Sequence, residues 1–298
     1  MCTAYLHDRP QVVQYLHSSC GVPLIEMHLA AANGSVGVIG LLLDLGVSGS
    51  EVRNGKTPLL VLCESGDFGD AVSLLLDRGG ADPNFVSSLT GRTPLHEACA
   101  LGATRTVSKL LPRMRLSFIN SCDMQGRTPL LVAVEEDRVE SIRELSCCEG
   151  ISFERESRMD GNRPLFAAIA RLRRMSTFVA LLDAGCDVNS RSHGLTPLHV
   201  ACMVNTSSYV RQLLRCPDID VNARTETGDR TTALILACIT RCPKTIRALM
   251  ERPELDFSAR DYWGDSALDV ARRIGDPEIL VALLKKVLEP SKSYAGLM

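Results

Sequence analysis

The segment TPLHEAC, residues 93–99, places three chemically active side chains within four positions. His96 and Cys99 could bind a zinc ion or form a thiol–imidazole pair, with Glu97 as a base. Either chemistry requires the reacting groups to converge on one point. The frame recurs, however, as TPLHVAC at 196–202, and weaker copies are TPLLVLC at 57–63, TPLLVAV at 128–134 and TALILAC at 232–238. Side chains repeated at such wide spacing belong to different layers of a fold, which favours a structural role over catalysis.

These copies are members of a longer series of repeats. Together with IEMHLAA, RPLFAAI and SALDVAR, the series has eight members, which start near residues 25, 57, 93, 128, 163, 196, 232 and 266. A period of this length indicates stacked supersecondary units that cannot bury their apolar faces alone. We therefore predict a repeat array over residues 22–288. A partial N-terminal capping repeat precedes it at 1–21, and a short tail follows at 289–298.

One repeat, residues 93–126, shows the elements that position these side chains. Thr93 can cap a first helix, and Pro94 takes the first helical position, where its missing N–H costs nothing. The letters GAT break that helix, and RTVSKLL predicts a second one with Val107, Leu110 and Leu111 on one face. A long polar segment with Gly126 then turns toward the next repeat. Each unit is predicted to be two short antiparallel helices followed by a projecting turn.

The units resemble ankyrin repeats. That family's signature is T-P-L-H-x-A, a glycine-containing break, V-x-x-L-L in the second helix and D-x-N in the following hairpin. Here the last two parts are written VIGLLLDLG, AVSLLLDRGGADPN, FVALLDAGCDVN and YVRQLLRCPDIDVN. The resemblance implies an all-α ankyrin-repeat solenoid of stacked helix-turn-helix units with short β-hairpin connections. The fourth copy departs from the pattern in SCCEGISFERESRMDGN, where we expect a distorted hairpin.

Composition limits the kinds of partner. The 33 basic and 35 acidic residues give a net charge of −2, so we expect no nucleic-acid partner. The N-terminus lacks the basic start and apolar run of a secretory signal. The most apolar region, 34–47, is short and contains Asp44, so we expect no direct membrane insertion. The chain is expected to work in the cytoplasm or the nucleus.

Four cysteines occupy the seventh place of their repeats: Cys63, Cys99, Cys202 and Cys238. Equivalent places form one packed layer, where free cysteine acts as a small apolar residue, and no CxxC spacing suggests zinc. We therefore expect no metal, no cofactor and no catalytic residue. The alternative is a thiol-based redox sensor or enzyme that uses adjacent Cys147 and Cys148, or Cys99 with His96. The resemblance implies that the rings of His96, His199 and His28 bond backbone or a neighbouring repeat's turn threonine.

Function then depends on the exposed surface. The resemblance implies a non-catalytic scaffold or adaptor, expected to be monomeric, that binds a protein on a concave side built from hairpins and first helices. A substrate-receptor subunit of a ubiquitin ligase is an alternative within that class. In our frame the fifth and eighth residues of each repeat face this side. They are Val61 and Glu64, Glu97 and Ala100, Val132 and Glu135, Ala167 and Ala170, Val200 and Met203, and Leu236 and Ile239.

The last two of these pairs are apolar, which predicts a partner groove over Val200, Met203, Leu236 and Ile239. The alternative is that neighbouring hairpins partly cover them. On the hairpin before the last repeat, Tyr262 and Trp263 are residue types that dominate interface energies, unless Trp263 folds down over that repeat. Further candidate contact residues on hairpin tips are Met124, Arg127, Arg191 and His193.

Three hairpin asparagines share one local pattern. Asn84, Asn189 and Asn222 each follow an aspartate by two residues. The resemblance implies possible substrates of an asparaginyl hydroxylase at these positions. A structural role is sufficient, however, and we favour it: the asparagine would cap the turn by bonding its own backbone.

Overall fold

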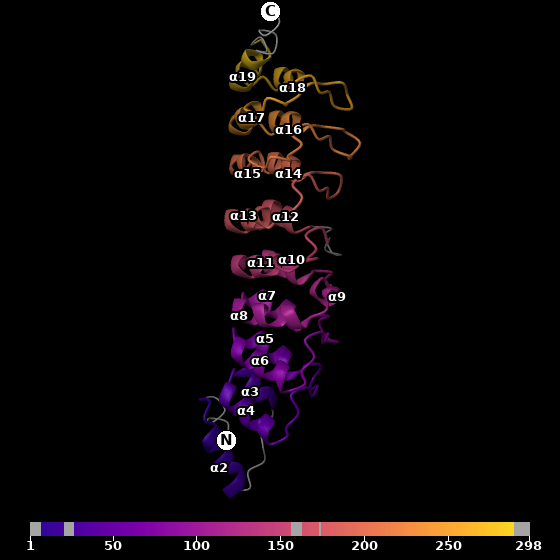
Figure 1. Ribbon diagram of the computed structural model, residues 1–298. Coiled ribbons are helices and arrows are strands. Elements are labelled where there is room, and N and C mark those ends of the chain that lie inside the picture. The colour runs from indigo at the N-terminus through magenta and orange to yellow at the C-terminus, as the bar shows by residue number, and fades with distance from the viewer. Residues whose placement is uncertain (1–6, 21–26, 156–162, 173, 289–298) are drawn as a thin grey trace, which may run out of the picture. The chain divides into compact units, whose positions relative to one another are not determined.

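The computed structural model describes residues 7–20, 27–155, 163–172 and 174–288. The chain divides into two compact units, unit 1 up to Pro164 and unit 2 from Leu165. Each unit is a stack of short antiparallel helix pairs (Figure 1). The predicted tail at 289–298 and part of the irregular fourth hairpin, residues 156–162, lie outside the described residues.

Unit 1 contains the first-helix and second-helix layers of the N-terminal repeats. Its helices are α2 (Pro10–Cys20), α3 (Met27–Ala32), α4 (Val36–Asp44), α5 (Pro58–Ser65), α6 (Gly69–Asp77), α7 (Pro94–Leu101), α8 (Thr104–Leu110), η1 (Leu111–Arg113), α9 (Leu116–Ile119), α10 (Pro129–Glu135) and α11 (Val139–Ser146). Helices α3, α5, α7 and α10 contact one another in that order, and α2, α4, α6, α8 and α11 do the same. Each repeat contributes one first helix and one second helix, so successive helices of the chain alternate between the two layers.

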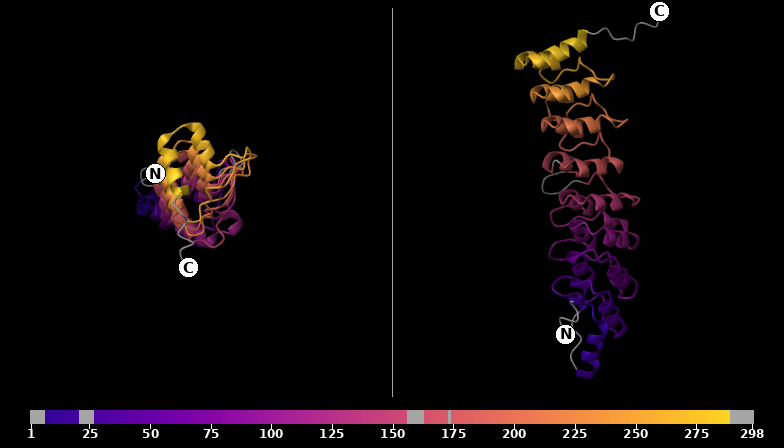
Figure 2. Two further views of the ribbon diagram at one scale, coloured as in Figure 1. Left: turned by 90° about the horizontal axis from the view of Figure 1, so that it is seen from above. Right: turned by 90° about the vertical axis from the view of Figure 1, so that its left-hand side faces the viewer.

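Unit 2 continues the pattern with its own two layers. Its elements are α12 (Pro164–Ala167), the π-helical η2 (Ala168–Leu172), α13 (Met175–Asp183), α14 (Pro197–Met203), α15 (Ser207–Leu213), α16 (Ala233–Ile239), α17 (Pro243–Met250), α18 (Ala267–Ile274) and α19 (Pro277–Leu288). The first helices α14, α16 and α18 pack in sequence, and so do α15, α17 and α19. Figure 2 shows the connections of this unit gathered on one side of its helices.

The repeated T-P dipeptide explains where most first helices begin. Each of the capping side chains accepts a hydrogen bond from the backbone N–H three residues later; these residues are Thr57, Thr93, Thr128, Thr196, Thr232 and Ser266. Proline takes the first helical position in four of these helices, α5, α7, α10 and α14. Because the cap satisfies a backbone donor that the helix leaves unbonded, a local sequence signal fixes the helix start.

The core is mainly aliphatic and lies between the two helix layers. In the repeat of residues 93–126, Leu95 is fully buried, and so are Val107 and Leu110, as their spacing predicts. Leu111, predicted on the same face, is only half-buried, because the α-helix ends before it and the 3-10 helix η1 begins there. The largest fully buried side chain is Phe178, whose ring meets that of Tyr209 edge to face at 4.8 Å. Within each unit, neighbouring repeats share this core, so contacts between adjacent repeats stabilise the stack.

The connections between repeats, which we call hairpins, are held together along the stack. Four of them contain isolated antiparallel bridges: Arg53 with Lys56, Ser192 with Leu195, Arg224 with Thr232, and Arg260 with Ser266. Consecutive tips are also bonded, as in Met124 N–H to Thr90 O (3.0 Å) and Tyr262 N–H to Asp229 O (2.8 Å). The connection between α8 and α10 differs from the projecting turn that we predicted, because part of it folds into the helices η1 and α9.

Candidate functional site

The histidine of the TPLHEAC segment is a structural group. His96 is fully buried, and its Nδ1 accepts the backbone N–H of Thr93 (3.1 Å) and lies 2.9 Å from the hydroxyl of Thr93. Its Nε2–H then donates to the carbonyl of Arg127 in the next hairpin (3.0 Å). Burial lowers the pKa of His96 to about 4, although the bond to Arg127 opposes the shift. Both ring nitrogens are used, so His96 is a neutral bridge between two repeats.

His199 repeats this arrangement three repeats later, in unit 2. Its Nδ1 accepts from Thr196 N–H (3.1 Å), its Nε2 bonds the carbonyl of Ala223 (3.0 Å), and burial lowers its pKa to about 4. The expectation that these rings bond backbone is confirmed, because both bond a carbonyl of the neighbouring hairpin. The threonine that each ring contacts is not that of the neighbouring repeat but the one that caps its own helix, because this cap lies only one helical turn away.

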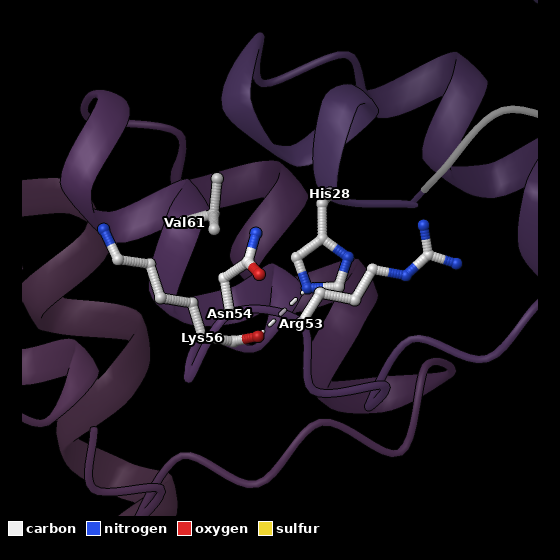
Figure 3. Close-up of a pocket in the computed structure, with 5 residues that line it drawn as sticks. All are labelled: His28, Arg53, Asn54, Lys56 and Val61. Carbon is white, nitrogen blue, oxygen red and sulfur yellow. Dashed lines mark hydrogen bonds between the residues drawn. The ribbon is translucent and has the colours of Figure 1, made fainter. Parts of the chain in front are cut away.

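His28 keeps only half of this pattern. Its Nε2 bonds the carbonyl of Lys56 at 3.0 Å (Figure 3), whereas its buried Nδ1 has no hydrogen-bond partner. Position 25 holds Ile, which offers no hydroxyl where the other two repeats have threonine. The missing hydroxyl accounts for the bond that His28 lacks, and only its bond to the neighbouring hairpin follows the expectation.

A cavity of about 460 Å³ adjoins this histidine (Figure 3). It is lined by His28, Arg53, Asn54, Lys56 and Val61. Its two cations already have partners, because Lys56 pairs with Glu64 at 2.6 Å and Arg53 with Glu51 at 3.1 Å. The positive charges are thus balanced within the protein, and the cavity offers no excess charge to an anionic ligand.

The cysteine layer is confirmed as part of the core. Cys63, Cys99, Cys202 and Cys238 are fully buried, and burial raises the pKa of each thiol, in Cys238 to about 12. Cys147 is exposed, and desolvation raises the pKa of its neighbour Cys148. A raised pKa keeps a thiol protonated and weakly nucleophilic. The arrangement of His96 and Cys99 is therefore unsuited to thiolate chemistry.

The fifth and eighth residues of the repeats, which we call the first-helix face, carry ion pairs in unit 1. These pairs are Lys56–Glu64 (2.6 Å), Arg92–Glu97 (2.9 Å) and Arg127–Glu135 (3.1 Å). Arg127 also holds the buried carboxylate of Asp123 at 2.8 Å. Its guanidinium thus joins the hairpin to the first helix, which is a structural use of a residue we predicted as a partner contact.

In two adjacent repeats of unit 2, those that start at Thr196 and Thr232, the same face is apolar and accessible. Met203 and Ile239, the eighth residues of adjacent repeats, are 50% and 51% exposed. Val200 and Leu236 beside them are half-buried, so hairpins do not cover this face completely. Our frame failed at two other fifth positions: Val132 is 1% exposed, and Ala167 in unit 2 is also 1% exposed, because their side chains pack into the core.

The last hairpin presents an aromatic pair. Tyr262 and Trp263 are 70% and 71% exposed, so Trp263 does not fold down over the last repeat. Their rings meet edge to face, with centroids 6.0 Å apart and planes at 89°. The backbone beneath them is fixed, because Trp263 N–H donates to the carboxylate of Asp261 (2.9 Å) and Tyr262 N–H bonds the preceding hairpin. These aromatics are therefore rigidly held.

The other predicted tip residues fall into two groups. Met124 and His193 are exposed. Arg191, by contrast, donates to the carbonyl of Arg224 in the next hairpin (2.8 Å) and pairs with Glu226 at 3.3 Å. Arg191 therefore ties two hairpins together, whereas Arg127 joins its hairpin to the first helix of its own repeat. Spacing alone could not reveal the role of Arg191, because the carbonyl that it binds is 33 residues away in the sequence.

The paired-helix geometry and its bonded hairpins agree with a comparison of the chain with known families. A family model described as ankyrin repeats, in three copies, matches residues 62–157 and 149–225, which together span more than half of the chain. The chain belongs to the ankyrin-repeat family. Comparison with curated proteins gives no match. Ankyrin repeats are generally protein–protein interaction modules and are typically non-catalytic.

Two observations on the described residues of this ankyrin-repeat protein bear on other kinds of site. No group of three or more His, Cys, Asp or Glu side chains in the described ranges could hold a metal ion. In the same ranges, the helices are all too short or too polar to cross a bilayer.

The hairpin asparagines of these ankyrin repeats act as clamps. Asn222 donates through Nδ2 to Glu254 O (2.7 Å) and accepts through Oδ1 from Asp256 N–H (2.8 Å), so it binds the next repeat. Asn189 makes the equivalent pair of bonds. Our interpretation that the asparagine bonds its own backbone was wrong. The aspartate two residues earlier does that, as Asp220 accepts the N–H of Asn222 (3.0 Å).

Asn84 makes only half of this clamp, because its Oδ1 accepts the N–H of Arg115 (3.0 Å) while its Nδ2 bonds Asp82 of its own turn (3.4 Å). A third complete clamp escaped the sequence analysis. Asn120 donates to Gly150 O (2.9 Å) and accepts from Ser152 N–H (2.8 Å). It lacks the aspartate two residues before it, because Phe118 stands there. The distance of Asn120 from the following capping threonine was a signal that could have identified it.

Proposed function

We propose that this ankyrin-repeat protein is a non-catalytic scaffold or adaptor, and that it binds a protein partner on unit 2. The contact surface would consist of the first-helix face at Val200, Met203, Leu236 and Ile239, with Tyr262 and Trp263 on the last hairpin. The observation that carries the proposal is the exposure of Met203 and Ile239 in adjacent repeats. Contiguous exposed apolar side chains in a soluble chain mark interaction sites.

The contrast with unit 1 supports this choice. There the residue before the helix cap is basic and pairs with an acidic residue of the same first helix, as in Lys56–Glu64. In two repeats of unit 2, Leu195 and Thr231 stand before the helix cap, where unit 1 has a basic residue. Met203 and Ile239 stand at the eighth position of these repeats, which Glu64 occupies in unit 1. Exposed apolar side chains are unfavourable in water, whereas an ion pair is well solvated there. Burial of Met203 and Ile239 by a partner would therefore stabilise the complex.

Rigidity of the surface also favours binding. The capped helices and bonded hairpins hold the contact residues in place before a partner arrives, so little conformational entropy is lost on association. An extended or helical segment lying across adjacent repeats would contact Met203 and Ile239 together. Ligase substrate receptors and other adaptors can both use such a surface, so the identity of the partner would assign the pathway.

The capture of partners from cells tests this surface. We expect the double variant Met203→Glu, Ile239→Glu to lower recovery of a specific partner at least about tenfold, because it places two charges in an apolar contact. The measurement is proximity labelling followed by affinity measurement with the purified partner. Val281→Glu, which charges an exposed apolar residue on α19, is the matched control. Equal recovery by all three proteins would remove the first-helix face as the binding surface.

Thiol labelling tests the redox alternative. In the native protein we expect fast modification at exposed Cys147, while Cys63, Cys99, Cys202 and Cys238 react only on unfolding, since burial keeps them protonated and inaccessible. Mass spectrometry after brief treatment with iodoacetamide, with and without urea, measures this order. Fast native modification of Cys99 would contradict the scaffold interpretation at that position.

A further inference from the structure

Two aspartates adjoin the backbone of the aromatic pair in the last hairpin. Tyr262 N–H donates to the backbone carbonyl of Asp229 (2.8 Å), which brings the tip of the preceding hairpin against Tyr262. Asp261 directly precedes Tyr262, and its Oδ1 accepts the N–H groups of Trp263 (2.9 Å) and Asp265 (2.8 Å). We call Asp229, Asp261, Tyr262 and Trp263 the tip site. It combines residues from two repeats that the hairpin bond holds together.

Local hydrogen bonds, rather than cations, keep these carboxylates in place. Asp229 Oδ1 accepts from the hydroxyls of Thr225 (2.7 Å) and Thr227 (2.6 Å). Burial opposes its ionisation, but the bonds from the threonines outweigh burial and lower its pKa. Over the part of the chain that the structure describes, neither Asp229 nor Asp261 has an ion pair with Lys, Arg or His. The two carboxylates of the tip site are therefore not neutralised by direct ion pairs within this part of the chain.

Nearby cations are engaged elsewhere or face other groups. Arg260 pairs with Asp269 (3.2 Å), Arg273 with Asp265 (2.5 Å) and Arg191 with Glu226 (3.3 Å). Arg230 follows Asp229 and is exposed, and among the described residues it has no ion pair with either carboxylate. The guanidinium of Arg224 binds the backbone carbonyls of Arg230 and Arg260, and its charge acts on Asp256. The buried imidazole of His199 lies near enough to Asp229 to feel its charge, and its pKa of about 4 keeps it neutral at physiological pH.

These features define the chemistry of a ligand. An edge-to-face pair uses only one ring face in its own contact, so other faces of the two exposed rings stay accessible, and aromatic faces attract cations. A purely apolar anchor would desolvate the two carboxylates without compensation. We infer that the tip site binds a basic side chain, arginine or lysine, of the protein partner. This inference rests on the proposed function, because the partner presents that side chain.

The single tryptophan of the chain gives a direct test. Because Trp263 is the only tryptophan, intrinsic fluorescence reports the tip site alone. We would titrate the full chain with acetylated and amidated peptides of sequence Gly-Ser-X-Ser-Gly, where X is arginine, lysine, citrulline or glutamate. Saturable quenching by the arginine and lysine peptides is expected. Binding of citrulline, the neutral isostere of arginine, should be at least about fivefold weaker.

Variants separate charge from ring contacts. The double variant Asp229→Asn, Asp261→Asn keeps the oxygen acceptors of both side chains, and should weaken the arginine peptide at least about fivefold. Asp183→Asn, Asp218→Asn changes the same net charge at exposed sites away from the tip, and should leave binding unchanged. Trp263→Ala, assayed by polarisation of a dye-labelled arginine peptide, should also lose binding.

The outcomes distinguish this inference from the proposed function. Any of three results would overturn the basic-side-chain inference. The citrulline and arginine peptides could bind with equal affinity, or the double variant Asp229→Asn, Asp261→Asn could bind the arginine peptide as the wild type does. The third is a flat titration with every peptide up to millimolar concentration. A partner lost by Met203→Glu, Ile239→Glu would still support the proposed function in that case. If no partner depends on that double variant, the first-helix proposal fails irrespective of the peptide result.

Discussion

Replacing Leu181 with Asp is expected to divide the unfolding of this protein into two transitions. Leu181 is fully buried in α13, and an uncompensated buried carboxylate costs at least about 4 kcal/mol. Repeats contact only their neighbours, so the loss should be confined to the repeat of α13 and those beside it. The helices of unit 1 and the C-terminal helices α14–α19 should then unfold separately.

Urea unfolding measured with two probes would show this. Circular dichroism follows all helices, whereas fluorescence of Trp263 follows only the C-terminal repeats. Two transitions in circular dichroism, one of which coincides with the fluorescence change, are expected for Leu181→Asp. The exposed Ala170→Asp adds the same charge nearby and should leave the wild-type curve nearly unchanged. A single, unaltered transition in Leu181→Asp would contradict nearest-neighbour stacking.

Mild acid should destabilise both units through their capping histidines. His96 and His199 have pKa values of about 4 when folded, against an ordinary value of 6.5. The unfolded chain therefore binds these protons more readily, so the stability that the neutral rings contribute is complete above pH 6.5 and falls as the pH drops toward 4. By linkage, the loss at pH 5 is about 2 kcal/mol for each histidine.

The free energy of unfolding in urea at pH 7.5 and pH 5 measures this effect. His96→Gln and His199→Gln should be less stable at pH 7.5 but should lose less stability between the two pH values, because the titrating group is gone. His193→Gln removes an exposed imidazole and should retain the wild-type difference. If His96→Gln, His199→Gln and wild type lose stability equally, other groups cause the acid sensitivity.

The sequence by itself determined the repeat, the positions of most first helices and the composition of the core. Thr93 caps the helix that Pro94 begins, and Val107 and Leu110 are buried on one face, as their spacing predicts. The role of Cys99 as a core residue also followed from its place in the repeat. These features depend on residues within one or two helical turns, so local propensity and periodicity are sufficient to predict them.

The tertiary structure alone decided which of the predicted surface residues are accessible and which link one repeat to the next. Val132 shares its repeat position with Val200 but is buried, and Arg191 bonds a carbonyl 33 residues away. The clamp of Asn222 on Glu254 and the bond that joins Asp229 to Tyr262 likewise connect separate repeats. Such contacts depend on how side chains of neighbouring repeats pack together, and the sequence of one repeat carries no record of that packing.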